Sequence, residues 1–261
     1  MKKIGVIGCG VMGGAMAVAL CKTAEVFVSD VNREKAEAFA EAHGCTACDT
    51  KTIVSECDWF IFAVKPNCYK DLCKQILPVL NHRKEKPLVI TLMAGVTRAS
   101  LAAQGIDAPI LRLMPNTPAQ IGQGMIPYCT DENAICEEFE ELFRFAGRCD
   151  RVQEEQLDMA CALSGCGPAY VCLMAEALAD GAVALGFPRE KAYLYAWQTL
   201  SGTAQLALEK KQHPGVLKDA VCSPGGATIQ GVIAMEEGGV RAALIEAVRR
   251  AFEKSQEIGR S

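Results

Sequence analysis

A short apolar run at residues 3–7 leads directly into Gly8-Cys-Gly10-Val-Met-Gly13, and residues 12–21 after it read as a helix. In such a strand–turn–helix, the first glycine permits the tight turn, the second lets the backbone approach a pyrophosphate, and the third lets helix and strand pack closely. Backbone N–H groups at the new helix start would face the phosphates. The pattern therefore predicts a dinucleotide-binding turn formed by Gly8, Gly10, Val11, Met12 and Gly13.

Asp30 ends the second predicted strand, 17 residues beyond Gly13. A carboxylate there accepts hydrogen bonds from an adenosine ribose and disfavours a 2′-phosphate. Asn32 and Arg33 follow at once, however, and an arginine could pair with that phosphate. Asn32 could equally be a simple helix N-cap. These residues predict NADH or NADPH as the cofactor and leave the choice open.

The N-terminal half, residues 1–152, alternates short apolar runs with helical stretches, which predicts a Rossmann-type α/β domain with a parallel sheet covered by helices on both faces. Nearly continuous apolar strands are typical of a sheet buried on both sides. The strands are expected at residues 3–7, 25–29, 59–64, 88–92 and 110–114, with a further pair at 124–129 and 145–152. The helices are expected at residues 12–21, 33–43, 69–80, 99–104 and 132–143.

The C-terminal half, residues 153–261, reads as all-helical, with helices at 168–185, 190–210, 228–236 and 240–258. The first of these is apolar nearly all round, and only Glu176 and Asp180 interrupt it. Such a helix needs burial on most sides. About 110 residues of helix could not provide that burial alone. We therefore expect this half to be a dimerisation domain that packs against another subunit.

Loops that follow parallel strands should line the cofactor. Three such loops consist of small, proline-held or amide residues that could approach a nicotinamide. The predicted cofactor contacts in them are Ala63, Val64, Lys65, Pro66, Ala94, Gly95 and Asn116. Lys65 could be a catalytic acid or merely a solvated lysine at the edge of a loop.

Two glycine-rich segments of the helical half, residues 164–168 and 223–228, each precede a predicted helix. Free backbone N–H groups, a hydroxyl and a positive helix end together could bind a carboxylate. Ordinary turns between helices are the alternative for both segments.

The composition and net charge limit the classes of partner that the chain is expected to bind. The net charge of −4 and the absence of a long basic run argue against nucleic acid or an anionic membrane. The sequence contains no apolar run of 18 residues without a charge, so a membrane span is not expected. The N-terminal apolar stretch contains several glycines between residues 5 and 14, which a phosphate-binding turn explains better than a secretory signal does. Fourteen scattered cysteines fit a reducing cytoplasm. His43, Cys45 and Cys48 offer too few ligands for a tetrahedral metal site, so no metal is predicted.

Four blocks, collinear over the whole chain, resemble the pyrroline-5-carboxylate reductase family: VKP at 64–66, MPNTPA at 114–119, ALSGCGPAY at 162–170 and, above all, SPGGATIQGVIAMEEGGVR at 223–241. The resemblance implies reduction of 1-pyrroline-5-carboxylate to L-proline with NAD(P)H, the last step of proline biosynthesis. It also implies that the substrate carboxylate is held by Ser223, Gly226, Ala227 and Thr228, with Thr228 beside the ring nitrogen as the catalytic residue. An intertwined homodimer, which could assemble into a decamer, is the implied partner state.

Three positions depart from the family pattern. Val11 stands where the family often has asparagine, and Cys166 replaces a small hydroxyl or glycine. Asp30 is unlike the Ser/Asn-rich segment of NADPH-preferring members, which again leaves the coenzyme open.

Two alternatives compete with this interpretation. A β-hydroxyacid dehydrogenase would need a lysine where Val171 stands, and valine cannot transfer a proton. A non-catalytic nucleotide sensor would need neither the nicotinamide-side loops nor a carboxylate site. None of the three histidines falls in a predicted site loop, which suits a protonated imine because that substrate is already electrophilic.

Overall fold

The computed structural model describes residues 1–260, with side chains through residue 257. The chain forms two compact units. One comprises Met1–Cys166 together with the residues from Ala251 onward, and the other is Gly167–Arg250. The predicted domain boundary between residues 152 and 153 stays a prediction.

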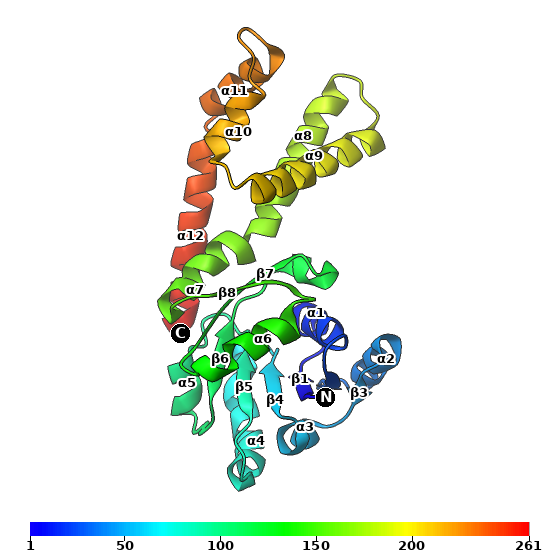
Figure 1. The fold of residues 1–261 in the computed structure, drawn as a ribbon, viewed down its shortest axis with the longest axis vertical. Coiled ribbons are helices and arrows are strands. Elements are labelled where there is room, and N and C mark those ends of the chain that lie inside the picture. Colours follow the sequence, from blue (N-terminus) through cyan, green and yellow to red (C-terminus); the bar gives the residue numbers. More distant parts are fainter. Residues whose placement is uncertain (261) are drawn as a thin grey trace. The chain divides into compact units, whose positions relative to one another are not determined.

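The first unit contains an eight-stranded sheet in the order β3-β2-β1-β4-β5-β6-β7-β8 (Figure 1). All neighbouring strands are parallel except β6 and β7, which are antiparallel. The predicted Rossmann-type sheet is confirmed, including its extension by the pair β7 and β8. The strands are β1 Lys3–Ile7, β2 Glu25–Ser29, β3 Thr46–Ala47, β4 Trp59–Phe62, β5 Leu88–Thr91, β6 Ile110–Leu113, β7 Gly124–Thr130 and β8 Gly147–Arg151.

Strand β4, in the middle of the sheet, is apolar at every position because helices cover both faces of the sheet. Along β4, Trp59 and Ile61 join one buried cluster, whereas Phe60 and Phe62 join the other. Helices α1, α2 and α6 contribute to the first cluster, and α3, α4 and α5 to the second. The helices of this unit are α1 Val11–Leu20, α2 Arg33–His43, α3 Thr50–Glu56, α4 Tyr69–His82, α5 Arg98–Ala103, α6 Cys136–Phe143 and α7 Glu154–Ala160. Short 3₁₀ turns lie at η1 Pro66–Cys68, η2 Thr117–Ile121 and η3 Asn133–Ile135.

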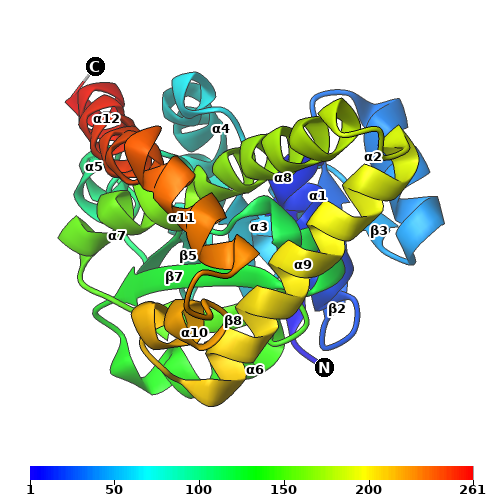
Figure 2. The ribbon, with the colours of Figure 1, turned by 90° about the horizontal axis from the view of Figure 1, so that it is seen from above.

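The second unit contains only helices, as predicted. They are α8 Gly167–Ala184, α9 Arg189–Lys210, α10 Pro214–Ala220, α11 Ala227–Glu237 and most of α12 Val240–Arg260. Helices α8 and α9 contact each other, and Figure 2 shows them diverging from the turn that joins them. The side chains they bury in the chain are small alanines, at positions 175 and 179 in α8 and at 192 and 196 in α9. Large apolar side chains such as Leu173, Leu178 and Leu194 are exposed.

The predicted turn at residues 164–168 is wrong. A π-helix, η4 Cys161–Gly165, follows α7 there, and α8 begins at Gly167. The Cys166 N–H donates to the Cys161 carbonyl over 2.9 Å, and the Ser164 hydroxyl donates to the Ala160 carbonyl over 2.8 Å. These groups are engaged by the helix backbone, so the segment does not form the open carboxylate nest expected of it.

Helical structure from Glu154 to Ala184 is long and apolar enough, by length and composition alone, to cross a membrane. Little of its most apolar window is buried within the chain. A helix that packs against another subunit has the same properties, so this feature is weak evidence for a membrane span.

The fourteen cysteines are free thiols, and Cys9, Cys57, Cys73 and Cys129 are buried. Burial raises the pKa of the Cys73 thiol to about 11, so it stays protonated near neutral pH. These cysteines therefore pack as small apolar side chains, as the sequence suggested.

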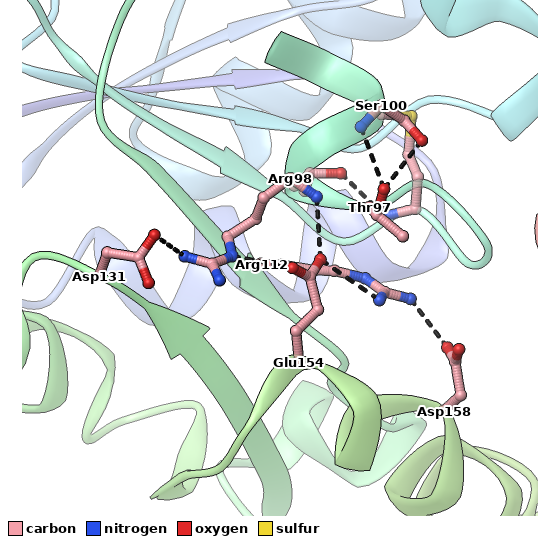
Figure 3. A network of polar contacts seen from close by, with 9 residues as sticks. Thr97, Arg98, Ser100, Arg112, Asp131, Glu154 and Asp158 are labelled. Atoms are coloured by element: carbon pink, nitrogen blue, oxygen red, sulfur yellow. Dashed lines mark hydrogen bonds and ion pairs between the residues drawn. The ribbon is translucent and has the colours of Figure 1, made fainter. Parts of the chain in front are cut away.

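A network of ion pairs holds α5 and α7 against β6 (Figure 3). Arg112 on β6 is 1% exposed, and its guanidinium lies 2.8 Å from the Asp158 carboxylate and 3.6 Å from the Glu154 carboxylate. Glu154 also accepts hydrogen bonds from the backbone N–H and the guanidinium Nε of Arg98, at 2.9 and 3.0 Å. Arg98 reaches Asp131 on its other side. This network fixes the strand that leads into the predicted loop containing Asn116.

We expect Asp158→Ala to lower the free energy of unfolding by about 2 kcal/mol, because it leaves part of a buried guanidinium without its closest partner. Chemical denaturation followed by circular dichroism measures the loss. Asp71→Ala is the matched control, since it breaks the exposed pair with Lys74 and should change stability by less than about 0.5 kcal/mol. Equal effects of the two substitutions would contradict the structural role of the network.

Candidate active site

The three glycines of the turn have two different roles: two allow close packing, and one leaves open space for a ligand. Gly8 has a φ of 110°, and a Cβ on it would lie 2.5 Å from the Ala63 carbonyl oxygen. A Cβ on Gly13 would overlap the Gly8 carbonyl oxygen. Gly10, the N-cap of α1, has an ordinary φ of −73°, and a Cβ on it would meet no atom within 4 Å. Packing therefore requires glycine at positions 8 and 13, whereas Gly10 faces open space in front of the helix N-terminus.

Asp30 lies beside this turn, at the carboxyl end of β2. Its Oδ2 accepts the Cys9 N–H at 2.9 Å and lies 3.3 Å from Lys35 Nζ, and its Oδ1 accepts the Asn32 N–H at 3.1 Å. Burial alone would raise the pKa of Asp30, but the hydrogen bonds from Asn32, Cys9 and Lys35 outweigh it and hold this pKa below the ordinary 3.8. The carboxylate is thus ionised at neutral pH.

A cavity of about 1000 Å³ opens at the carboxyl ends of β1, β2 and β4. It is bordered by seven of the predicted cofactor residues, Gly8, Gly10, Asp30, Arg33, Ala63, Val64 and Lys65. The other predicted contacts, Val11, Met12, Gly13, Asn32, Pro66, Ala94, Gly95 and Asn116, do not line it. Its size and its open glycine turn suit a dinucleotide.

Several residues of that second group have structural roles that the structure shows directly. The Asn32 side chain caps α2 by accepting the Lys35 N–H at 3.0 Å. Asn116 accepts the Met125 N–H at 2.9 Å and donates to the Ser164 carbonyl at 3.0 Å. Its amide thereby links the loop after β6 to β7 and to the π-helix. Cofactor contacts by Asn32 and Asn116 stay predictions.

The remaining predicted contacts fall at turns and helix starts. Val11 opens α1 and is exposed, and Met12 packs partly against the core. Lys65 is exposed and directly precedes Pro66, the first residue of η1. Ala94 and Gly95 form the turn after β5, where Gly95 has a φ of 75°.

In the second unit, residues 223–228 form a turn that ends in a helix start. The Gly226 N–H donates to the Ser223 carbonyl at 3.0 Å, and Gly226 is the N-cap of α11 without a side-chain cap. The first N–H groups of an α-helix have no partner within the helix. Ser223, Ala227 and Thr228 are exposed beside them. This segment keeps the free N–H groups and hydroxyls that carboxylate binding needs.

Comparisons with known proteins agree along the chain. A family model described as pyrroline-5-carboxylate reductase dimerisation matches residues 154–258, and one described as NADP oxidoreductase coenzyme F420-dependent matches residues 3–95. The pyrroline-5-carboxylate reductase of Escherichia coli is 38% identical over 100% of this chain and 99% of that protein. The chain belongs to the pyrroline-5-carboxylate reductase family.

Solved structures of this family share the whole fold. The enzyme from Coxiella burnetii is 31% identical, with a TM-score of 0.90 over 100% of this chain and 99% of that one. The Plasmodium falciparum pyrroline carboxylate reductase, solved with NADP bound, is 28% identical, with a TM-score of 0.87 over 99% and 98% of the two chains. The predicted family is therefore confirmed, and membership of a reductase family removes the main support for a β-hydroxyacid dehydrogenase.

The sequence did not single out Lys35, although it lines the cavity and contacts Asp30. A lysine in the first turn of a predicted helix is usually solvated. The one signal is its spacing of five residues from Asp30, across the Asn32 N-cap, which lets the side chain fold back to the strand end.

Proposed function

We propose that this chain reduces 1-pyrroline-5-carboxylate to L-proline with NADPH or NADH, the last step of proline biosynthesis. The observation that carries the proposal is the uncapped start of α11 at residues 223–228, in a chain that also has a dinucleotide-type cavity. Relatives named for this reaction match over nearly their full lengths.

In the proposed mechanism the chain orients the substrate and places groups of partial positive charge beside its carboxylate. The backbone N–H groups of Ala227 and Thr228 and the Ser223 hydroxyl would hold the carboxylate near the positive end of α11. The cofactor supplies the hydride. The carbon of the imine, whose nitrogen is already protonated, would accept it, and the C=N double bond would become a C–N single bond while the nitrogen keeps its proton. The Thr228 hydroxyl would stand beside that nitrogen and hydrogen-bond to it. No imidazole acid is needed, because the imine is already electrophilic.

We also propose a cytoplasmic homodimer formed through the helical unit, with dimers assembling into a decamer. The support is the match to a dimerisation family model and the set of large exposed apolar side chains on that unit, Leu173, Leu178, Leu194, Trp197 and Ile245. Burial of these side chains between two copies would remove them from water. Sedimentation velocity tests the proposal, and a monomer at micromolar concentration would contradict it.

The decisive experiment measures initial rates with pyrroline-5-carboxylate under NADH and then NADPH. We expect oxidation of the reduced coenzyme that depends on the imine acid and yields proline. A protein that binds NAD(P)H tightly but does not oxidise it in this assay would instead be a nucleotide sensor. A dehydrogenase of alcohols would instead reduce NAD(P)⁺ while it oxidises its substrate.

Asp30 gives a prediction on coenzyme choice. If its carboxylate accepts the adenosine ribose hydroxyls, Asp30→Ser should shift the preference toward NADPH by about 1 kcal/mol or more, because a charge-assisted hydrogen bond is lost for NADH and a repulsive charge is removed for NADPH. The ratio of kcat/KM for the two coenzymes measures this. An unchanged ratio would show that Asp30 does not contact the ribose.

A further inference from the structure

The Asp30 carboxylate is nearly saturated with donors in the structure. Two are backbone N–H groups, from Cys9 and Asn32, and the third is the Lys35 ammonium. An ionised carboxylate offers about four lone-pair sites, so one remains. A ribose diol that donates two hydrogen bonds to Asp30 needs two sites, and one existing donor must therefore leave.

Lys35 is the donor that can leave. Cys9 N–H and Asn32 N–H are fixed by the glycine turn and by the start of α2. The Lys35 side chain is about half exposed, at 49%, and its contact of 3.3 Å is the longest of the three. An ion pair of this exposure is weak and easily exchanged for water. Movement of one lysine side chain thus decides how many Asp30 lone pairs face the cavity.

We propose that Lys35 determines coenzyme choice in opposite directions for the two coenzymes. It competes with the ribose hydroxyls of NADH for Asp30, and it supplies the cation that offsets Asp30 and pairs with the 2′-phosphate of NADPH. The inference rests on the proposed function, because it requires the adenosine ribose to lie at Asp30. Lys35 lines the same cavity as Asp30, so its ammonium can swing from the carboxylate to a phosphate without leaving the site.

Arg33 also lines the cavity, and its environment differs from that of Lys35. Its guanidinium bonds Glu37 at 2.7 Å in an exposed i,i+4 pair, and its side chain is 89% exposed. Arg33 has no contact with Asp30 among the interactions of the described residues. It could help to bind a 2′-phosphate, but it does not compete with ribose hydroxyls. Glu37 and Asp71 also line the cavity and add negative charge that a phosphate would meet.

The test compares Lys35→Met, Arg33→Met and the unmodified full-length protein. Dissociation constants for NADH and NADPH are measured by fluorescence titration, and those for ADP and for adenosine 2′,5′-bisphosphate by calorimetry. For Lys35→Met we expect about tenfold weaker binding of the two 2′-phosphorylated ligands and at least twofold tighter binding of NADH and ADP. For Arg33→Met we expect weaker binding of the 2′-phosphorylated ligands alone. Lys86→Met is the matched control, since it breaks a lysine–aspartate pair with Asp107 outside the cavity.

Two results would overturn the inference. One is a Lys35→Met protein that loses affinity for NADH and NADPH by the same factor, and the other is one that leaves both unchanged. The binding measurements need no substrate. An enzyme inactive with pyrroline-5-carboxylate would therefore refute the proposed function, while the coenzyme titrations would still decide the role of Lys35.

Discussion

We expect Gly10→Val to weaken NAD(P)H binding severely in a protein that still folds. A side chain at Gly10 meets no atom within 4 Å, and the φ of −73° suits any residue. The fold therefore tolerates it, at a cost of about 1 kcal/mol or less because valine is a poor N-cap. The same side chain fills the space where the backbone must approach the pyrophosphate. We expect affinity to fall by about 100-fold or more, or roughly 2.7 kcal/mol.

Gly13→Ala is the matched control for this experiment. Its Cβ would overlap the Gly8 carbonyl oxygen and approach Ala63, so the strand and the helix must separate. We expect a large loss of stability in thermal unfolding, whereas Gly10→Val melts close to the unmodified protein. Coenzyme titration and thermal unfolding of both variants separate the two roles. Retained NAD(P)H affinity in Gly10→Val would refute the assignment of the turn.

Local sequence signals predicted those elements whose burial leaves a simple pattern. Strands β1 and β2 and helix α2 have the predicted bounds, 3–7, 25–29 and 33–43. The strands are largely apolar runs because the sheet is buried on both faces. Helix α2 carries both of its end signals, the Asn32 cap and Gly44, which has a φ of 72°.

Helix α3 and strand β3 were missed for a different reason. Helix α3 has only seven residues and contains Thr50, Thr52, Ile53 and Val54, which are β-branched and poor helix formers. Capping by Asp49 and burial of Ile53 and Val54 against the sheet stabilise it. The burial is a tertiary effect that a single short segment does not reveal, and the Asp49 cap is a local signal that does not by itself establish a helix of seven residues.

The π-helix was hidden by its own composition. Glycine and proline at residues 165–168 are typical of a turn. In the structure, Asn116, 48 residues away, donates to the Ser164 carbonyl, and the extra residue is accommodated within the helix. Likewise, the position of Asp30 follows from a local pattern, whereas the return of Lys35 to Asp30 depends on the path of α2. Sequence patterns can place single residues, whereas contacts between residues of different elements can be found only once the fold is known.

Thr228→Ala should lower kcat by about 100-fold, because the imine loses the hydrogen bond that orients its nitrogen for hydride transfer, and it should leave NAD(P)H affinity unchanged. Thr228 lies in the first turn of α11 and is exposed there. The dinucleotide cavity is formed by residues of the other unit, so the substitution removes a hydroxyl without altering any side chain of that cavity.

Two further variants make this result specific. Thr228→Ser keeps the hydroxyl and should retain most of the activity. Thr203→Ala removes an exposed hydroxyl from α9 and should leave kcat within twofold. If Thr228→Ala weakened coenzyme binding and turnover equally, its substrate role would be refuted. If serine failed to restore turnover, the threonine methyl rather than the hydroxyl would be the group that matters, and the positive end of α11 alone would carry the recognition of the imine acid.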